Sequence, residues 1–302
     1  MKSQQTINLT DLILLTLVSL GWGFTFPVMK IGLLTYPPIS FRALTLLTGI
    51  VTMAIYMLLC RHRLRIHGTD FWKVCGISQI NLTAWQLGLL YGILVLGAGR
   101  AAIIGYTMPV WAFVASVLLY GASVSGRGVA GVALALVAVI ALTLNDWSSF
   151  TAAPAGLLLT VFAAMCWGLG TAMIRNTPMQ ISNESMALWS LTSALPAYVL
   201  LATWLERDLW RLPTPIEVWS MLYGGVISFS FCYVVWYRLS RKLPPVVSSL
   251  SIMLVPVIGV FSSTAWLGET ATYLDVIALI LILCAMAIVL LPARYLGLKS
   301  SN

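Results

Sequence analysis

The sequence predicts an all-α integral membrane protein with ten transmembrane helices arranged as two inverted five-helix repeats. Apolar stretches of about 20 residues, the length of helix that crosses a bilayer core, follow one another from residue 11 to residue 292. Of the 302 residues, 60% are hydrophobic and only 9% are charged, whereas a soluble domain carries about 25% charged residues. The third observation is an internal repeat that relates the two halves of the chain.

The repeat is visible in a tryptophan-glycine pair, Trp22-Gly23, which recurs 145 residues later as Trp167-Gly168. Three further pairs are separated by 147 residues: Trp72 and Trp219, Pro109 and Pro256, and Gly121 and Gly268. Five helices in each half would force the two copies to insert with opposite orientations. We therefore predict a first repeat at 1–148 and an inverted second repeat at 149–302, integrated into one membrane domain. Inverted repeats are typical of secondary transporters, whose substrate site lies between the repeats near the bilayer midplane.

The predicted spans are joined by short loops, the longest of which lies around residues 206–217. In chain order the spans are 11–34, 39–60, 71–95, 99–120, 126–145, 155–175, 184–205, 217–238, 245–267 and 272–292. The first is too long for a signal-peptide core and matches the sixth, so it belongs to the fold. The loops leave no room for a soluble nucleotide-binding domain, and no Gly-Lys dipeptide of a P-loop occurs. Transport energy is therefore expected to come from a gradient.

The net charge of +8 predicts an orientation and not a nucleic-acid partner. With a cytoplasmic N-terminus, the inner side holds Lys2, Arg61, Arg63, Arg65, Lys73, Arg127, Arg175, Arg238, Arg241, Lys242, Arg294 and Lys299. The outer side holds Lys30, Arg42, Arg100, Arg207 and Arg211. Twelve basic residues against five place both termini in the cytoplasm. Lys30 and Arg42 fall near outer helix ends, where long basic side chains extend to the interface.

Titratable groups are missing from the predicted membrane interior. Both histidines lie in the loop after the second span, and all nine acidic residues map to loops or helix ends. Proton-coupled carriers usually place such a residue inside the membrane, so the sequence favours a uniporter or exchanger. A membrane-embedded enzyme would need a nucleophile-base pair or metal ligands at depth. We therefore predict no catalytic residues, no metal site, no cofactor and no enzymatic activity.

Four tryptophans fall near the centres of predicted spans and not at the interfaces where tryptophan is common: Trp22, Trp85, Trp111 and Trp167. An indole N–H at that depth has no lipid partner and needs a protein or water partner. Each alone is consistent with a buried packing residue. Because they occur together in related spans, we expect them to line a substrate cavity.

Polar side chains at matching positions extend this candidate site. They are Gln79, Thr83 and Gln86 on one face of the third span, and Ser228, Ser230 and Tyr233 in the eighth, where Ser228 matches Asn81. Unpaired amides are costly in hydrocarbon, so this face looks into protein or water. Both a cavity wall and hydrogen bonding between helices fit the pattern.

Two prolines mark the remaining candidates. Tyr106 precedes Pro109 in the fourth span, and Ser251 and Met253 precede Pro256 in the ninth. Proline breaks a backbone hydrogen bond, so both prolines are candidate hinges, and packing kinks are an equal alternative.

These features resemble the drug/metabolite transporter superfamily, specifically its EamA-type members with tandem five-helix units that each open on a mid-helix Trp-Gly. The end of the ninth span, Leu267-Gly268-Glu269 after Pro256, also resembles that family. The first repeat departs from it, with Gly121-Ala122 where the acidic residue would stand. The chain is most similar to the YddG-type exporters of amino acids. The resemblance implies export through the bacterial inner membrane and a cavity walled by spans 1, 3, 4, 6, 8 and 9.

The predicted substrate is a small metabolite, foremost an aromatic or other neutral amino acid, which needs apolar contacts for its side chain and neutral dipoles for its ends. The alternative is a multidrug exporter of organic cations. Such an exporter ordinarily presents a buried carboxylate in its first span, where this chain offers Trp22, Phe24, Thr25 and Phe26, a set that could form a cation–π cage. The expected partners are the substrate and the lipid bilayer, and a monomer is expected.

Overall fold

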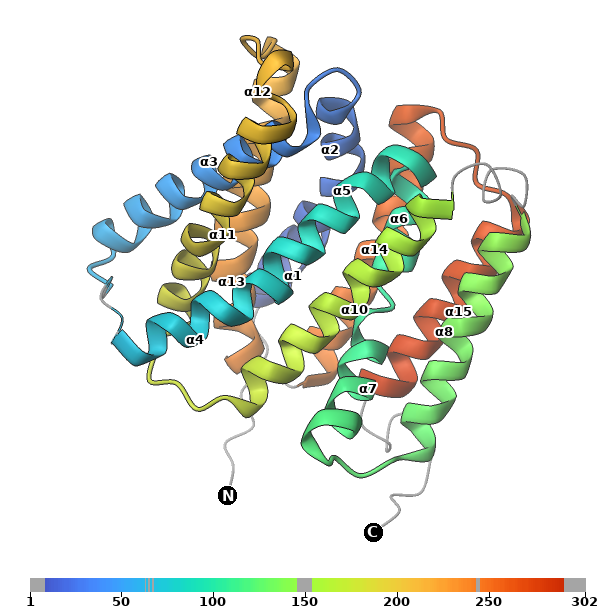
Figure 1. Ribbon diagram of the computed structural model, residues 1–302. Helices are drawn as coiled ribbons and strands as arrows, with labels where there is room; N and C mark the ends of the chain where they lie inside the picture. Colours follow the sequence, from blue (N-terminus) through green and yellow to red (C-terminus); the bar gives the residue numbers. More distant parts are fainter. Residues whose placement is uncertain are drawn as a thin grey trace.

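The computed structural model describes residues 9–62, 64, 66, 68–145, 154–242 and 245–290, and every regular element among them is helical (Figure 1). Eight helical stretches of this part are long and apolar enough to cross a membrane. They are Leu9–Leu33, Pro38–Leu59, Gly68–Leu96, Ala98–Tyr120, Pro154–Asn176, Asn183–Leu205, Pro215–Trp236 and Tyr273–Leu290. Two shorter apolar helices, Gly126–Leu142 and Ser251–Leu267, lie at the other two predicted spans. The fold is that of a multi-pass membrane protein.

The helices of the first half follow the predicted spans to within a few residues. They are α1 (Leu9–Gly23), α2 (Thr25–Leu33), α3 (Pro38–Leu59), α4 (Gly68–Ser78), the π-helix η1 (Gln79–Ala84), α5 (Trp85–Leu96), α6 (Ala98–Gly105), α7 (Met108–Tyr120) and α8 (Gly126–Asn145). Long apolar runs with charges at their ends define these boundaries, which is why hydropathy alone locates them.

The helices of the second half also follow the predicted spans, without the breaks that divide the first and fourth spans of the first half. They are α10 (Pro154–Asn176), α11 (Asn183–Leu205), the 3-10 turn η2 (Arg207–Leu209), α12 (Pro215–Leu222), the π-helix η3 (Tyr223–Phe231), α13 (Cys232–Lys242), α14 (Pro245–Leu267) and α15 (Tyr273–Leu290). Residues 291–292 of the last predicted span and both chain ends lie outside the described residues.

Four of the predicted spans are not uniform α-helices, and one of them, the fourth, is broken between α6 and α7. The first is interrupted between α1 and α2 at Phe24, three residues before Pro27, whose missing N–H leaves the carbonyl of Gly23 without its helical partner. The third and eighth each contain a π-helix, η1 and η3, at matching positions of the two halves. π-Segments are rare and frequently occur at functional sites. Both of these carry residues of the candidate site.

The two candidate hinges differ in structure. Pro109 lies in the first turn of α7, after a break that separates α6 from α7, whereas Pro256 lies inside the continuous helix α14. The two helices nevertheless end with the same backbone geometry, since Gly121 after α7 has φ 65° and Gly268 after α14 has φ 66°. Glycine adopts this left-handed conformation without the cost that a side chain would incur.

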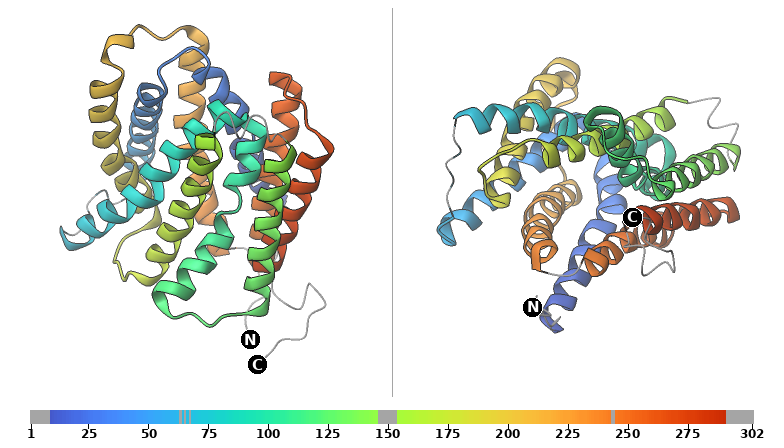
Figure 2. Two further views of the ribbon diagram at one scale, coloured as in Figure 1. Left: turned by 45° about the vertical axis from the view of Figure 1, so that its right-hand side comes forward. Right: turned by 90° about the horizontal axis from the view of Figure 1, so that it is seen from below.

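Helices of the first half pack directly against helices of the second. α8 lies along α15, α10 along α5 and α7, α11 along α3, and α1 along α14. The α8–α15 pair is clear at one edge of the bundle (Figures 1 and 2). We call the face at which α7, α10 and α15 end the lower face, and the face at which α2 and α14 end the upper face, as they stand in Figure 1.

Candidate functional site

A cavity of about 1010 Å³ lies between the two halves of the bundle. Seven of the thirteen predicted substrate-binding residues line it: Trp22, Trp85, Gln86, Tyr106, Trp167, Ser228 and Tyr233. Pro109 lines it too, and Pro256 does not. The wall comes from the six expected spans and also from α3, α11 and the last residues of α15.

The cavity opens at the lower face. At that end its wall consists of exposed residues at the ends of α7 and α10, namely Tyr120, Ala122, Arg175 and Asn176. At the other end the wall consists of buried residues, among them Met29, Phe41, Arg42 and Ser220. In this conformation a solute would therefore enter and leave through the lower face.

Aromatic side chains from both halves form the apolar wall of the cavity. Trp85 of α5 and Trp167 of α10 lie 5.4 Å apart between ring centres, in a tilted arrangement. Trp22 of α1 meets Tyr233 of α13 edge to face at 5.8 Å. Aromatic pairs favour these offset and edge-on geometries. The cavity is therefore suited to a solute with an apolar or aromatic part.

Each tryptophan-glycine segment contacts the matching position of the other half, although the donor differs between the two contacts. In the first, the indole N–H of Trp22 donates to the carbonyl of Ser228 at 3.2 Å. In the second, Nδ2 of Asn81 donates to the carbonyl of Trp167 at 3.0 Å. Asn81 and Ser228 are 147 residues apart, so the same two positions meet in both copies with the roles of the halves exchanged.

The amide of Gln86 faces the cavity and is available to a solute. Gln86 is 8% exposed and makes no side-chain hydrogen bond to any residue in the part of the chain that the structure describes. Ser228 is engaged, because its hydroxyl lies 2.5 Å from that of Thr25. Thr25 also lines the cavity.

Six predicted residues lie outside the cavity wall, and four of them join helices or turns by hydrogen bonds. Gln79 donates to the carbonyl of Ser193 at 3.0 Å, and the Thr83 hydroxyl donates to Gln79. Ser230 donates to the carbonyl of Gly49 at 3.1 Å, and the Ser251 hydroxyl lies 2.6 Å from that of Ser19. For Gln79, Ser230 and Ser251 the structure contains hydrogen bonding between helices, the alternative that the sequence left open. The Thr83 bond lies within η1.

The other two pack within the bundle. The indole N–H of Trp111 donates to the hydroxyl of Thr107 one turn earlier at 3.1 Å, and Met253 packs against the hydrophobic core. Gly168 lies against the backbone of Trp111 and Ala112, with 2.6 Å between an added Cβ and the Ala112 nitrogen. Close packing of α7 on α10 thus holds Trp111 beside the cavity wall and not in it.

The expectation that Arg42 extends to the outer interface is wrong. Its side chain is buried, with the residue 2% exposed, and it lines the closed end of the cavity. The rotation of α3 is fixed by its packing on α11 and η3, and that rotation turns Arg42 inward. The sequence contained one signal for this, an arginine inside the predicted span 39–60 and not beyond it.

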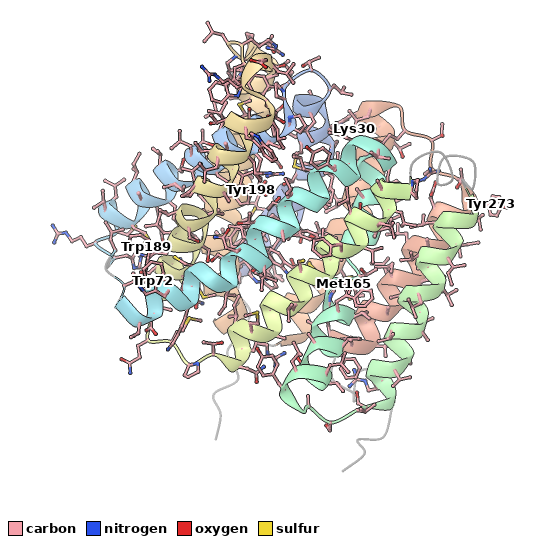
Figure 3. All side chains as sticks on the ribbon, viewed as in Figure 1. Lys30, Trp72, Met165, Trp189, Tyr198 and Tyr273 are labelled. Carbon is pink, nitrogen blue, oxygen red and sulfur yellow. The ribbon has the colours of Figure 1, made fainter. Side chains whose placement is uncertain are left out.

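Ion pairs link the elements above the closed end. Lys30 Nζ lies 2.6 Å from Glu269 Oε1, and Figure 3 shows Lys30 near the upper face. Glu217 accepts hydrogen bonds from the hydroxyl of Thr35 at 2.5 Å and from Arg211 at 2.9 Å. The Lys30–Glu269 pair joins the two halves of the chain directly. Arg211 and Glu217 both belong to the second half, and the hydrogen bond from Thr35 joins this pair to the first half.

The sequence profile of the EamA-like transporter family matches twice, at residues 9–144 and 154–291. The chain belongs to the EamA-like transporter family. This family consists of transporters and not enzymes, and the coarse role of the chain is accordingly the movement of a small molecule across a membrane.

Relatives of this EamA-like chain bear the names of transporters and match it along most of their length. An uncharacterized transporter of Bacillus subtilis, YoaV, is 25% identical over 271 residues, which are 89% of this chain and 92% of that protein. A probable amino-acid metabolite efflux pump of Escherichia coli is 23% identical over 296 residues, 94% and 96% of the two chains. A solved crystal structure with 18% identity gives a TM-score of 0.65 over 92% of this chain and 98% of that one, which shows a shared fold.

Proposed function

We propose that this protein exports small metabolites, foremost aromatic and other neutral amino acids, from the bacterial cytoplasm through the inner membrane. The observation that carries the proposal is the cavity, in which aromatic rings and neutral polar groups from both halves surround a space of about 1010 Å³. A related protein of Escherichia coli bears the name of a probable amino-acid metabolite efflux pump, which agrees with this substrate class.

The mechanism is alternating access between two inverted repeats of five spans each, at residues 1–148 and 149–302. Support comes from the exchanged contacts of Trp22 with Ser228 and of Asn81 with Trp167. The matching π-helices η1 and η3 support it further. Rocking of paired helices around the cavity would expose it to the upper face in the second state.

The basic residues at the lower face favour a cytoplasmic location for that face, and hence for both chain termini. In this orientation the cavity of the present conformation opens to the cytoplasm, as an exporter requires for loading. Fusions of alkaline phosphatase and of a fluorescent protein to the C-terminus test the orientation. A periplasmic C-terminus would contradict it.

The proposed transport needs no buried carboxylate for proton coupling. Among the described residues no Asp, Glu or His lines the cavity. Coupling would require a group whose protonation differs between the two states and alters substrate affinity. Without such coupling, the substrate would move down its own concentration gradient. The transporting unit would be a monomer.

The alternative, a multidrug exporter of organic cations, is weakened by the charges of the cavity. Arg42 and Arg175 line it, and no described carboxylate does. A cationic solute would meet like charges with only aromatic rings to offset them.

Uptake into proteoliposomes that contain only this protein tests the function. We expect saturable counterflow of labelled phenylalanine or tryptophan and no counterflow of a lipophilic dication. The reverse preference would favour the alternative. An imposed pH gradient, without a substrate gradient, should produce no accumulation.

A further inference from the structure

The guanidinium of Arg42 lines the cavity and has no anionic partner among the residues that the structure describes. Arg42 is the fifth residue of α3, is 2% exposed, and lines the closed end of the cavity. No carboxylate among the described residues lies within ion-pair distance of it. Its Nε is buried and has no hydrogen-bond partner in the described part of the chain.

The contacts that Arg42 does make are weak. Nη2 is directed at the thioether sulfur of Met29, and the guanidinium lies 5.7 Å from the centre of the Phe229 ring. Thioethers are poor acceptors, and a cation–π contact offsets only part of the cost of burying a charge. Neither contact uses the planar array of donors that distinguishes arginine from lysine.

Glu206, an acidic residue that contacts the first turn of α3, is already engaged. Glu206 follows α11, and its two carboxylate oxygens accept hydrogen bonds from the backbone N–H of Ile39 at 2.8 Å and of Ser40 at 2.7 Å. The Ser40 hydroxyl donates to Glu206 as well, at 2.7 Å. Glu206 thus caps the first turn of α3 and leaves Arg42 uncompensated.

A buried charge without a counter-ion is costly, and a charged group inside a membrane protein usually serves function. We propose that Arg42 binds the carboxylate of the transported molecule. A carboxylate matches the guanidinium fork with two parallel hydrogen bonds, and the cavity wall is where such a group can arrive.

The wall beyond Arg42 defines the rest of the ligand. Phe229, under the guanidinium, lies 6.4 Å from Tyr233 between ring centres, and Tyr233 lies 5.8 Å from Trp22. This aromatic wall leads from the charged group toward the middle of the cavity. The ligand is therefore a carboxylate with an apolar or aromatic body.

The cavity offers the amino group of an amino acid weaker contacts than it offers the carboxylate. No described carboxylate lines it, so an ammonium group finds neutral oxygens, such as that of the Gln86 amide, and aromatic faces. The ligand class thus comprises zwitterions and monoanions with an aromatic body, and it excludes the corresponding amines.

This inference rests on the proposed function, and competition for uptake of labelled phenylalanine separates the two. We expect unlabelled phenylalanine and 3-phenylpropionate to inhibit uptake and phenethylamine, which lacks the carboxylate, to inhibit at least about tenfold more weakly. Equal inhibition by the acid and the amine would overturn the Arg42 assignment and leave the transport function standing.

Variants of Arg42 test the contact itself. Arg42→Gln should raise the half-saturating concentration of phenylalanine at least about tenfold, and Arg42→Lys should raise it less, because lysine keeps the charge without the fork. Arg61→Gln removes an exposed basic residue just beyond the other end of α3 and is the matched control. An unchanged half-saturating concentration in Arg42→Gln would overturn the assignment.

Thermal stability of the purified protein gives a readout that is independent of transport. We expect 3-phenylpropionate, and not phenethylamine, to raise the melting temperature of the wild-type protein, and Arg42→Gln to lose that rise. Carboxylate-dependent stabilisation without any amino acid uptake would refute the proposed function and retain the Arg42 site. Stabilisation by the amine to the same extent as by the acid would refute the site.

Discussion

Glu269 bonds to Lys30 and at the same time caps the first turn of α6. Its Oε1 lies 2.6 Å from Lys30 Nζ and accepts the backbone N–H of Ala98 at 2.8 Å, while its Oε2 accepts that of Gly99 at 3.0 Å. One carboxylate from the loop after α14 therefore ties together α2 and α6 of the other half. These contacts lie at the upper face, beyond the closed end of the cavity, where the proposed outward opening would separate the halves.

We expect loss of this ion pair to favour the outward-open state. Lys30 and Glu269 are about one-fifth exposed, and a pair of this kind stabilises by up to about 1 kcal/mol, which is roughly a fivefold change in population. Lys30→Met or Glu269→Gln should therefore increase labelling of Met29→Cys by an impermeant maleimide added at the upper face, in a background without the native cysteines.

Lys73→Met serves as the control for this experiment, because Lys73 pairs with Asp70 3.2 Å away in α4, at the lower part of the bundle. That substitution should not increase the labelling at the upper face. Unchanged labelling in both Lys30→Met and Glu269→Gln would show that the ion pair does not contribute to closure.

The Glu269 contact should be independent of pH between about 5 and 8. Burial alone would raise the pKa of Glu269, but hydrogen bonds from Lys30 and from the backbone of Gly99 and Ala98 hold the pKa below its usual value. A lowered pKa means that the stabilisation is fully present above the ordinary carboxylate range and is lost only as pH falls through the lowered value. When the pair opens, the pKa of Glu269 returns toward the ordinary carboxylate range, so Glu269 stays ionised near neutral pH in both states.

The measurement is the same maleimide labelling at pH 5, 6, 7 and 8, corrected for the pH dependence of the thiol by a labelled model peptide. A several-fold rise in labelling between pH 7 and pH 5 would contradict the prediction.

Substitution of Gly97 should destabilise the upper face more than substitution of a comparable glycine elsewhere. Gly97 has φ 90° and ψ 160°, a conformation that is essentially limited to glycine, and an added Cβ would lie 2.9 Å from Glu269 Oε1. Gly97→Ala should therefore cost about 1–3 kcal/mol and lower the melting temperature. Gly121→Ala, at φ 65° with nothing within 4 Å of the added Cβ, is the control and should cost less. Equal losses would show that contact with Glu269 adds nothing.

The sequence predicts the helical spans well because each is a long apolar run with charged or turn-forming residues at its ends. It does not predict how each helix is rotated about its axis, since that is decided by packing against the other half. Arg42 and Trp111 show the consequence. Both lie inside predicted spans, yet the packing of α3 turns Arg42 into the cavity and the packing of α7 on α10 keeps Trp111 out of it.

The sequence pattern also does not predict the two π-helices or the break at Phe24. A hydropathy profile does not reveal a π-helix. One extra residue in a helical turn changes the direction in which the side chains point and leaves the composition of the segment unchanged. The repeat, by contrast, is a comparison within the chain and needs no knowledge of packing. For that reason the sequence alone shows that Trp22 corresponds to Trp167 and that Asn81 corresponds to Ser228. In the structure Trp22 contacts Ser228 and Trp167 contacts Asn81, so the corresponding positions meet in both halves.

Trp167 and Trp111 offer the clearest test of which predicted residues contact the substrate. Trp167 lines the cavity and lies 5.4 Å from Trp85, whereas Trp111 does not line it and donates its indole N–H to Thr107. Truncation of a buried aromatic anchor typically weakens binding by about 2 kcal/mol or more, so Trp167→Ala should raise the half-saturating concentration of phenylalanine at least about tenfold. Trp111→Ala should change it less than about threefold, even if it lowers thermal stability, because the residue supports the wall without touching the solute.

Uptake is normalised to the folded protein in each preparation, so that a loss of stability is not read as a loss of affinity. A larger effect of Trp111→Ala than of Trp167→Ala on the half-saturating concentration would place the substrate on the other side of α7 and refute the cavity described here as the transport site.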